Sequence, residues 1–501
     1  MRVVPDPLSA AALAYLALPS LIFLLGWAEL PVGLPIAALV VVAVATLAGQ
    51  LPAQQESSRS VAAWGFLLLL AAGWAALAGG SHLTYANKDW ITRDTVFADL
   101  ILTAWPPSYG DLEGAPLVLR TAMGFFLPPA LAAKTAGLIW APAAMFVWTW
   151  IGAFLFLGLL PLPQKFSLRF VALAALPVLF SGMDALGIVL TLGHAPIFPL
   201  PFEWWGKWTY SSLTAQLFWA PNHALALFIG TALFFRYRTA PGVLQLAVVL
   251  LPLLLIWTPF APIGLLPWFA WAMLQVRHSD TRLERVSKVQ WSASLALTLL
   301  VAALFSAPGV PAAFSDEVAA GGRLDASHDG LPSLLLAYAQ FIGCEFLILA
   351  LVLHPFAGTL RREWALATTL LLLIPLIRFG PSNDWVLRVA TPSLVVLMIV
   401  SAHALGAGLT TPAMRLRLVP VVLVIAIGAA TPVSEITRAL TWRRSPPNYG
   451  SSLLQDQRGY LAPHYIGRLE GAPRAVLFRS PVRVPEAEAR LARVPASLRL
   501  R

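Results

Sequence analysis

Charge and cysteine are scarce in this chain of 501 residues. Only 12% of the residues are charged while 58% are hydrophobic, a balance that a water-soluble protein of this size does not need. The single cysteine, Cys344, excludes a disulfide framework and a thiol-based metal site. The net charge of +10 is not gathered in a basic stretch with interleaved aromatic residues, so nucleic acid is not expected as a partner, and anionic membrane lipids are. The composition indicates an integral membrane protein.

Long apolar runs recur from one end of the chain to the other. Runs of roughly 15 to 24 residues are long enough to cross a hydrocarbon core as helices, and they lack the alternation of barrel strands. We therefore predict an all-α, polytopic helical membrane protein with about thirteen transmembrane helices. The predicted spans are 8–28, 32–50, 61–79, 136–159, 169–190, 221–236, 242–258, 262–276, 289–307, 331–354, 363–377, 386–405 and 417–434.

The segment from Leu117 to Lys134 is apolar but is interrupted by Arg120 and by a proline pair. We predict that it lies in the membrane interface and does not cross. With this reading and a cytoplasmic N-terminus, every short basic loop faces the cytoplasm, as basic residues do in membrane proteins. The C-terminus is then extracytoplasmic, and the Ala-, Leu-, Arg- and Pro-rich composition is typical of a bacterial inner membrane. The basic residues of these loops are Arg59, Lys165 with Arg169, Arg236 with Arg238, the cluster 277–288, Arg361 with Arg362, and Arg415 with Arg417.

This arrangement divides the chain into a transmembrane domain, 1–434, and an outward-facing tail, 435–501. The tail lacks sustained apolar periodicity, so we expect partly ordered structure against the outer face and no separate catalytic domain. Candidate functional residues concentrate in the outer loops, where loops commonly carry function. These loops are 80–135, 191–220, 308–330 and 378–388.

The first outer loop packs charge between two apolar runs, which in a membrane protein usually marks a working site. A helix from Asp89 to Thr103 would place Asp94 within its apolar arc. Because an unpaired carboxylate is strongly disfavoured in a low dielectric, we expect Asp94 to be partnered or used. Asp99 falls on the polar side of the same helix, where we expect water to solvate it. Asp89 either caps the helix or pairs with Arg93 one turn later, or else belongs to the site.

Two further outer segments carry candidate binding residues. The loop before residue 221 is rich in tryptophan, which anchors proteins at membrane interfaces and also packs well against sugar rings. The turn 378–388 carries two arginines, and guanidinium groups suit phosphate, although Arg388 also has the spacing for a salt bridge with Asp384. Candidates for sugar or acceptor binding are Glu203, Trp204, Trp205, Trp208, His223, Asn383 and Asp384, and candidates for lipid-phosphate binding are Arg378, Arg388, Arg93 and Lys88.

The layout resembles the GT-C superfamily of polytopic membrane glycosyltransferases, which use polyprenyl-phosphate-linked sugars outside the cytoplasm. The resemblance is architectural and covers most of the chain. It implies that Asp94 or Asp89 is the catalytic base, that Arg378 and Arg388 hold the lipid phosphate of the donor, and that the acceptor is a glycan or lipid. It also implies an added N-terminal hairpin, because the acidic loop follows the third predicted span and not the first. No metal cluster stands out, so no cofactor is predicted, and a need for a divalent metal such as Mg²⁺ or Mn²⁺ stays open.

Three other functions stay open. A transporter or flippase of a lipid-linked sugar or anionic solute would need ionisable residues near mid-membrane, for which Glu345 and Asp184 are the acidic candidates. A glycan polymerase or ligase also uses lipid-linked sugars and outer arginines, but it is expected to have its large outer loop late in the chain. A purely structural role would leave the position of Asp94 unexplained.

Overall fold

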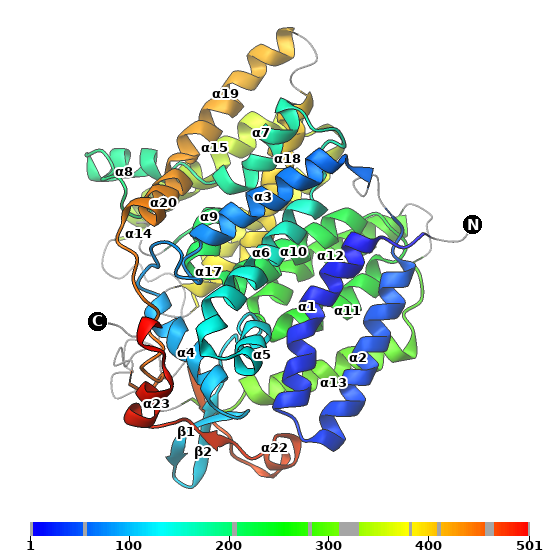
Figure 1. Cartoon of the computed structure of the whole chain (residues 1–501). Coiled ribbons are helices and arrows are strands. Elements are labelled where there is room, and N and C mark those ends of the chain that lie inside the picture. Colours follow the sequence, from blue (N-terminus) through cyan, green and yellow to red (C-terminus); the bar gives the residue numbers. More distant parts are fainter. Residues whose placement is uncertain are drawn as a thin grey trace.

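The computed structural model describes residues 4–53, 58–202, 208–278, 283–309, 330–379, 383–407, 412–455 and 465–498. In this part of the chain the backbone is mostly helical, and the long helices lie side by side as a bundle (Figure 1). The N-terminal half contains the helices α1 (Pro7–Gly26), α2 (Leu30–Gln50), α3 (Val61–Leu77), α4 (Trp90–Leu102), α5 (Leu127–Ala136), α6 (Ala141–Leu159), α7 (Leu168–Leu179), α8 (Asp184–Leu192), α9 (Leu213–Trp219), α10 (Pro221–Tyr237) and α11 (Val243–Leu255).

The second half continues the bundle and ends in short elements. Its helices are α12 (Phe260–His278), α13 (Lys288–Phe305), α14 (Gly330–Ile342), α15 (Ile348–Leu353), α16 (Arg361–Leu373), α17 (Asp384–Val389), α18 (Thr391–Ala407), α19 (Pro412–Gly428), α20 (Ala430–Thr441), α22 (Ala472–Leu477) and α23 (Ala487–Arg493). A π-helical turn, Gly343–Leu347, joins α14 to α15.

Seven of the described helices are long and apolar enough to cross a membrane. An eighth span results if α7 and α8, which meet at a bend of 46°, are counted as one. The prediction of a polytopic helical protein therefore agrees with the structure, whereas the count of about thirteen is not reached. Several predicted spans form helices of 13 to 17 residues, such as α3, α10 and α11, shorter than the ~20 residues of a typical transmembrane helix.

A small four-stranded sheet corrects the all-α prediction. Its strands are β1 (Pro107–Leu112), β2 (Ala115–Leu119), β3 (Ile466–Arg468) and β4 (Val482–Arg483), in the order β3-β2-β1-β4. Strands β1 and β2 form an antiparallel hairpin whose two turn residues, Glu113 and Gly114, both have positive φ, as a type I′ turn requires. β3 pairs antiparallel with β2, and β4 pairs parallel with β1. The sheet thus joins the first predicted outer loop to the C-terminal tail.

The predicted interfacial segment Leu117–Lys134 is also divided differently. Its first residues belong to β2, and only its later residues form a helix, α5, which begins at Leu127 with prolines in its first turn. Proline is favoured there because the first turn leaves its N–H groups unpaired in any case. Lys134 in the last turn lies over the ring of Trp105, 5.1 Å from its centroid. The segment is therefore a strand and a short helix, not one continuous element.

The bundle has two distinguishable ends. At one, called the sheet end, β1, β2 and α22 lie beyond the lower ends of α1, α2 and α13 in Figure 1. At the other, called the far end, Asp6 pairs with Arg236 at 2.9 Å and so ties the start of α1 to the last turn of α10. Helix α10 runs between the two ends, as do α17 and α18 in succession. Residues on these helices can therefore be assigned to one end or the other.

Candidate functional site

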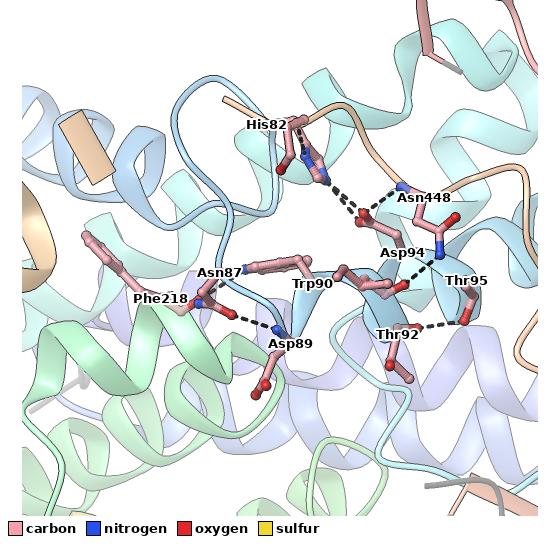
Figure 2. A network of polar contacts seen from close by, with 11 residues as sticks. His82, Asn87, Asp89, Trp90, Thr92, Asp94, Thr95, Phe218 and Asn448 are labelled. Carbon is pink, nitrogen blue, oxygen red and sulfur yellow. Dashed lines mark hydrogen bonds and ion pairs between the residues drawn. The ribbon is translucent and has the colours of Figure 1, made fainter. Parts of the chain in front are cut away.

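Helix α4 organises the sheet end, and side chains of the preceding loop fix where it starts. The side-chain oxygen of Asn87 accepts a hydrogen bond from the backbone N–H of Asp89 at 3.1 Å. The carbonyl oxygen of Phe218 in α9 accepts two hydrogen bonds, from the Asn87 amide at 2.8 Å and from the Trp90 indole at 3.0 Å (Figure 2). Asp89 occupies the capping position but makes no capping hydrogen bond with its side chain. The start of α4 is thus fixed by contacts with α9 and not by an acidic cap.

Asp94 is buried and fully engaged by two other segments. Its carboxylate lies 3.1 Å from Nε2 of His82 and accepts a hydrogen bond from the backbone N–H of Asn448 at 2.9 Å (Figure 2). The other ring nitrogen of His82 lies 2.9 Å from the carbonyl oxygen of Ser445. Burial alone would lower the pKa of His82, but its interactions with Asp94 and with the Ser445 carbonyl together outweigh burial and raise the pKa. The position of Asp94 in the apolar arc is therefore accounted for by a buried contact between α4 and the tail.

The expectation that water solvates Asp99 is wrong. Its side chain is completely buried and pairs with Arg490 of α23, which is equally buried. It also accepts hydrogen bonds from the hydroxyl of Tyr109 at 3.0 Å and from the backbone N–H of Leu453 at 3.1 Å. The polar side of α4 faces the tail, which the sequence pattern of the helix alone does not reveal.

Asp89 stands apart from these buried contacts. Its carboxylate is 3.2 Å from Arg93, and its side chain is 39% exposed. Figure 2 shows this carboxylate pointing away from Asp94. Arg93 is itself buried against the ring of Trp90, with its guanidinium carbon 5.9 Å from the ring centroid. Of the two acidic residues predicted for catalysis, Asp89 is thus the one whose carboxylate water or a ligand reaches.

Arg388 of α17 lies near Asp89 and Arg93. It is buried, lies 3.7 Å from Asp384, and is close enough to Arg93 and Asp89 for their charges to act on it. Tyr465, just before β3, experiences the charges of the same residues. Burial raises the pKa of Tyr465, so its hydroxyl stays protonated and can donate a hydrogen bond. We call Asp89, Arg93, Asp384, Arg388 and Tyr465 the arginine–aspartate cluster.

Two buried polar atoms beside the cluster are left for a ligand to satisfy. His223 at the start of α10 is close enough to Arg93 and Arg388 to experience their charges. Its Nδ1 and the Nε of Arg388 are buried and have no hydrogen-bond partner among the described residues. Buried donors are almost always paired in folded proteins, so such orphaned groups need a partner. An anionic or hydroxyl-rich ligand would supply one.

The turn 378–388 supplies Asp384 and Arg388 to the cluster, and its other predicted residues, Asn383 and Arg378, have different positions. The side-chain oxygen of Asn383 accepts a hydrogen bond from the backbone N–H of Phe379 at 3.3 Å, and Asn383 itself adopts a left-handed backbone with φ of 49°. It therefore shapes the turn. Nε of Arg378 has no hydrogen-bond partner in the described part of the chain, and no described contact joins Arg378 to Arg93 or Arg388.

Trp208 and Lys88 are not part of the cluster. Trp208 is buried, stacks on Phe341, and donates its indole N–H to the carbonyl of Pro375 at 3.0 Å, so it is a core residue with no face left for a sugar. Lys88 is exposed at the start of α4. Glu203, Trp204 and Trp205 lie outside the described residues.

The sequence patterns missed the contribution of the tail. Tyr465 belongs to the cluster, and the backbone of Asn448 binds Asp94, yet neither carries a motif or a periodic signal. His82 begins the charged stretch of the first outer loop, but its partner is 12 residues away and no local spacing rule links them. In the part of the chain that the structure describes, no group of three or more His, Cys, Asp or Glu side chains is placed to hold a metal ion.

Comparison with models of protein families, with curated proteins and with solved structures finds no match to this chain.

Proposed function

We propose that the protein is a membrane glycosyltransferase of the GT-C type, which moves a sugar from a polyprenyl-phosphate-linked donor to an extracytoplasmic glycan or lipid acceptor. One observation carries the proposal: Arg388, far away in the sequence, lies near enough to Arg93 and to the partly exposed carboxylate of Asp89 for their charges to act on it. Two guanidiniums suit a phosphate group, because each offers paired donors with fixed geometry. A carboxylate next to them suits the hydroxyl group of an acceptor.

In the proposed reaction the acceptor hydroxyl oxygen attacks the anomeric carbon of the donor sugar. Asp89 takes the hydroxyl proton, and the bond between the anomeric carbon and the phosphate oxygen breaks, with its electron pair leaving on the phosphate. Arg93 and Arg388 stabilise the negative charge that grows on that phosphate, which is usually the larger contribution to such a rate. His223 and Tyr465 lie where they can donate hydrogen bonds to the phosphate or the sugar.

The choice of Asp89 over Asp94 rests on access. A general base must reach the proton it removes, to about 3 Å or through one water. The carboxylate of Asp94 is occupied by His82 and by the backbone of Asn448, whereas that of Asp89 has an exposed side. We therefore assign the base to Asp89 and a structural contact to Asp94.

Placing this site outside the cytoplasm is supported by the basic residues at the far end. Arg59 donates to the carbonyl oxygen of Gly158 at the end of α6, Arg236 pairs with Asp6, and both belong to loops predicted to be cytoplasmic. Basic residues gather on the cytoplasmic side of membrane proteins. We accordingly propose a bacterial inner membrane, with the N-terminus in the cytoplasm and the C-terminal tail outside it.

A transporter is the second candidate, because of a pair of buried carboxyl groups. Asp184 at the bend between α7 and α8 and Glu345 in the π-helical turn are both buried and lie within hydrogen-bond reach of each other. Asp184 also accepts a hydrogen bond from the hydroxyl of Thr431 at 2.8 Å. Broken helices with ionisable residues at membrane depth are typical of transporter binding sites. The substrate would be a lipid-linked sugar or an anionic solute.

The test is sugar transfer by purified protein in lipid nanodiscs, with a panel of radiolabelled polyprenyl-phosphate sugars as donors and membrane extract as acceptor. We compare Asp89→Asn and Asp94→Asn with a matched control, Asp111→Asn, whose carboxylate is exposed on β1. Asp89→Asn should lower transfer about 100- to 10,000-fold with an unchanged melting temperature. Asp94→Asn should instead lower the melting temperature, and the control should change neither.

Two results would reject parts of the proposal. If Asp94→Asn loses transfer at an unchanged melting temperature while Asp89→Asn stays active, then Asp94 is the catalytic base and Asp89 is not. Absence of transfer from every donor, together with substrate uptake into proteoliposomes that Glu345→Gln abolishes, would replace the glycosyltransferase by the transporter.

A further inference from the structure

A cavity of about 730 Å³ opens at the far end of the bundle. Its walls come from the loop after α6, the first turns of α7, the last turns of α10 and α18, and the short helical turn Gly358–Leu360. Ligand pockets commonly have volumes of about 300 to 1,000 Å³. The cavity is therefore large enough for a small molecule or for the headgroup of a lipid.

This cavity is separate from the arginine–aspartate cluster. Helix α10 carries His223 in its first turn, beside the cluster, and Arg236 in its last turn, which lines the cavity. With a rise of about 1.5 Å per residue, these two positions are roughly 20 Å apart along the helix axis. The two sites lie at opposite ends of the same helix.

The ionisable side chains that line the cavity are all basic, and Thr239 and Thr359 add two neutral hydroxyl groups. Arg169, Arg236, Arg238 and His403 line it, and no carboxylate is among its described lining residues. Arg236 and Arg238 are paired with Asp6 and Glu363 at 2.9 and 2.6 Å, and neither of these two carboxylates lines the cavity.

Arg169 and His403 differ from the two paired arginines. Neither has a hydrogen bond or ion pair within the described ranges, although their side chains face the same space. The guanidinium of Arg169 reaches across to α18, where a Cβ added at Gly406 would lie 2.7 Å from its Nη2. The absence of a side chain at Gly406 thus makes room for Arg169 in the cavity.

Most of the remaining wall is apolar. Leu162, Leu173, Phe235 and Ile399 line it beside the basic groups. A basic pocket with apolar walls between membrane helices suits an anionic headgroup whose glycerol and acyl portions continue along the helices. Arginine suits phosphate in particular, through paired and charge-assisted hydrogen bonds.

We infer that this cavity binds a phosphate group, held by Arg169 and His403, as a second anion site independent of the cluster at the sheet end. The phosphate can be that of an anionic phospholipid or a free phosphate ion. Arg236 and Arg238 remain tied to the bundle by their carboxylate partners. The inference stands whether or not the cluster at the sheet end transfers sugars.

The test measures binding by native mass spectrometry of the purified full chain. One arm titrates phosphatidylglycerol, with phosphatidylcholine as the zwitterionic comparison, and a second arm titrates inorganic phosphate. Arg169→Gln and His403→Gln should each weaken binding of the anionic ligand roughly tenfold, since each removes one hydrogen-bonding group on the phosphate. The matched control is Arg417→Gln, which removes one exposed positive charge at the same end but does not line the cavity.

A second variant blocks the space without changing charge. Gly406→Leu places a side chain where Arg169 now reaches and should reduce binding at an unchanged net charge. Tight binding of phosphatidylglycerol alone identifies a lipid headgroup as the source, and equal binding of inorganic phosphate identifies a free ion. The inference fails if both ligands bind Arg169→Gln and Gly406→Leu as tightly as the parent protein, or if Arg417→Gln weakens binding as much as Arg169→Gln does.

Discussion

Replacing Arg490 by methionine removes the positive partner of a completely buried carboxylate. Arg490 and Asp99 both have 0% side-chain exposure, and Arg490 also donates a hydrogen bond from Nε to the carbonyl of Tyr449 at 3.0 Å. Breaking a buried ion pair by removing one member typically costs about 3–5 kcal/mol, because the remaining charge is left uncompensated. We expect Arg490→Met to lower the free energy of unfolding by this amount and to release the tail from α4.

The remaining hydrogen bonds of Asp99 determine how that cost depends on pH. Burial raises the pKa of Asp99, while Arg490, the N–H of Leu453 and the hydroxyl of Tyr109 act in the opposite direction. Without Arg490 the carboxyl should take up a proton more readily. A carboxyl whose pKa is higher in the folded than in the unfolded state contributes stability at low pH and loses it as the pH rises through the folded pKa. The destabilisation of Arg490→Met should therefore shrink as the pH is lowered toward 3.8, the ordinary value for Asp.

The assay combines thermal unfolding, followed by tryptophan fluorescence, with limited proteolysis of the tail in nanodiscs. Arg493→Met is the matched control, because it removes an exposed arginine from the same helix and should change stability by less than about 0.5 kcal/mol. The double variant Asp99→Asn/Arg490→Met should recover part of the loss, since no buried charge is left unpaired. Equal proteolysis of Arg490→Met and Arg493→Met, or a double variant no more stable than the single one, would refute this reasoning.

Two further predictions concern other buried contacts. Contacts with Asp94 and with the Ser445 carbonyl raise the pKa of His82 above 6.5, so the contact between His82 and Asp94 stabilises fully at pH values below 6.5 and weakens as the pH rises through the raised pKa. Proteolysis of the tail should therefore increase as the pH is raised above 6.5, and His82→Gln should abolish the dependence. Gly182→Ala should lower stability by about 1–3 kcal/mol in thermal unfolding, because its Cβ would lie 2.3 Å from Oε2 of Glu345 and 2.8 Å from the backbone of the same residue. Gly65→Ala, with nothing within 4 Å of the new Cβ, should leave the melting temperature unchanged or slightly higher, and equal losses in both variants would contradict the steric argument.

The helices were predictable because their signal is local. An apolar run such as residues 8–28 or 32–50 contains within itself what a helix in a membrane requires, and α1 and α2 follow these runs closely. The sheet was not predictable in the same way. Its strands have two to six residues, and β1 pairs with β4 through Pro107 and Val482, which are separated by most of the chain. Pairing over such a distance leaves no periodic pattern in either strand.

In the candidate site, too, contacts within one helix were predictable from the sequence, and contacts with distant segments were not. Spacing along one helix was enough to predict the contact of Asp89 with Arg93, which the structure gives as 3.2 Å. The different roles of Asp94 and Asp99 depend on the tail, which provides the backbone of Asn448 to one and Arg490 to the other. A helix examined alone cannot reveal which of its sides a distant segment covers, so Asp99 was expected in water.

The geometry of α4 connects the tail to the proposed chemistry. Five residues advance by about 500° around a helix, so Asp89 and Asp94 project roughly 140° apart. The tail holds the side with Asp94, and Asp89 is thereby directed toward α17 and Arg388. The tail also contributes Tyr465 to the cluster itself. Undocking the tail should therefore abolish sugar transfer while leaving Asp89, Arg93 and Arg388 unaltered. Transfer that survives in a protein whose tail has been cut away would show that α4 holds its orientation through α9 alone.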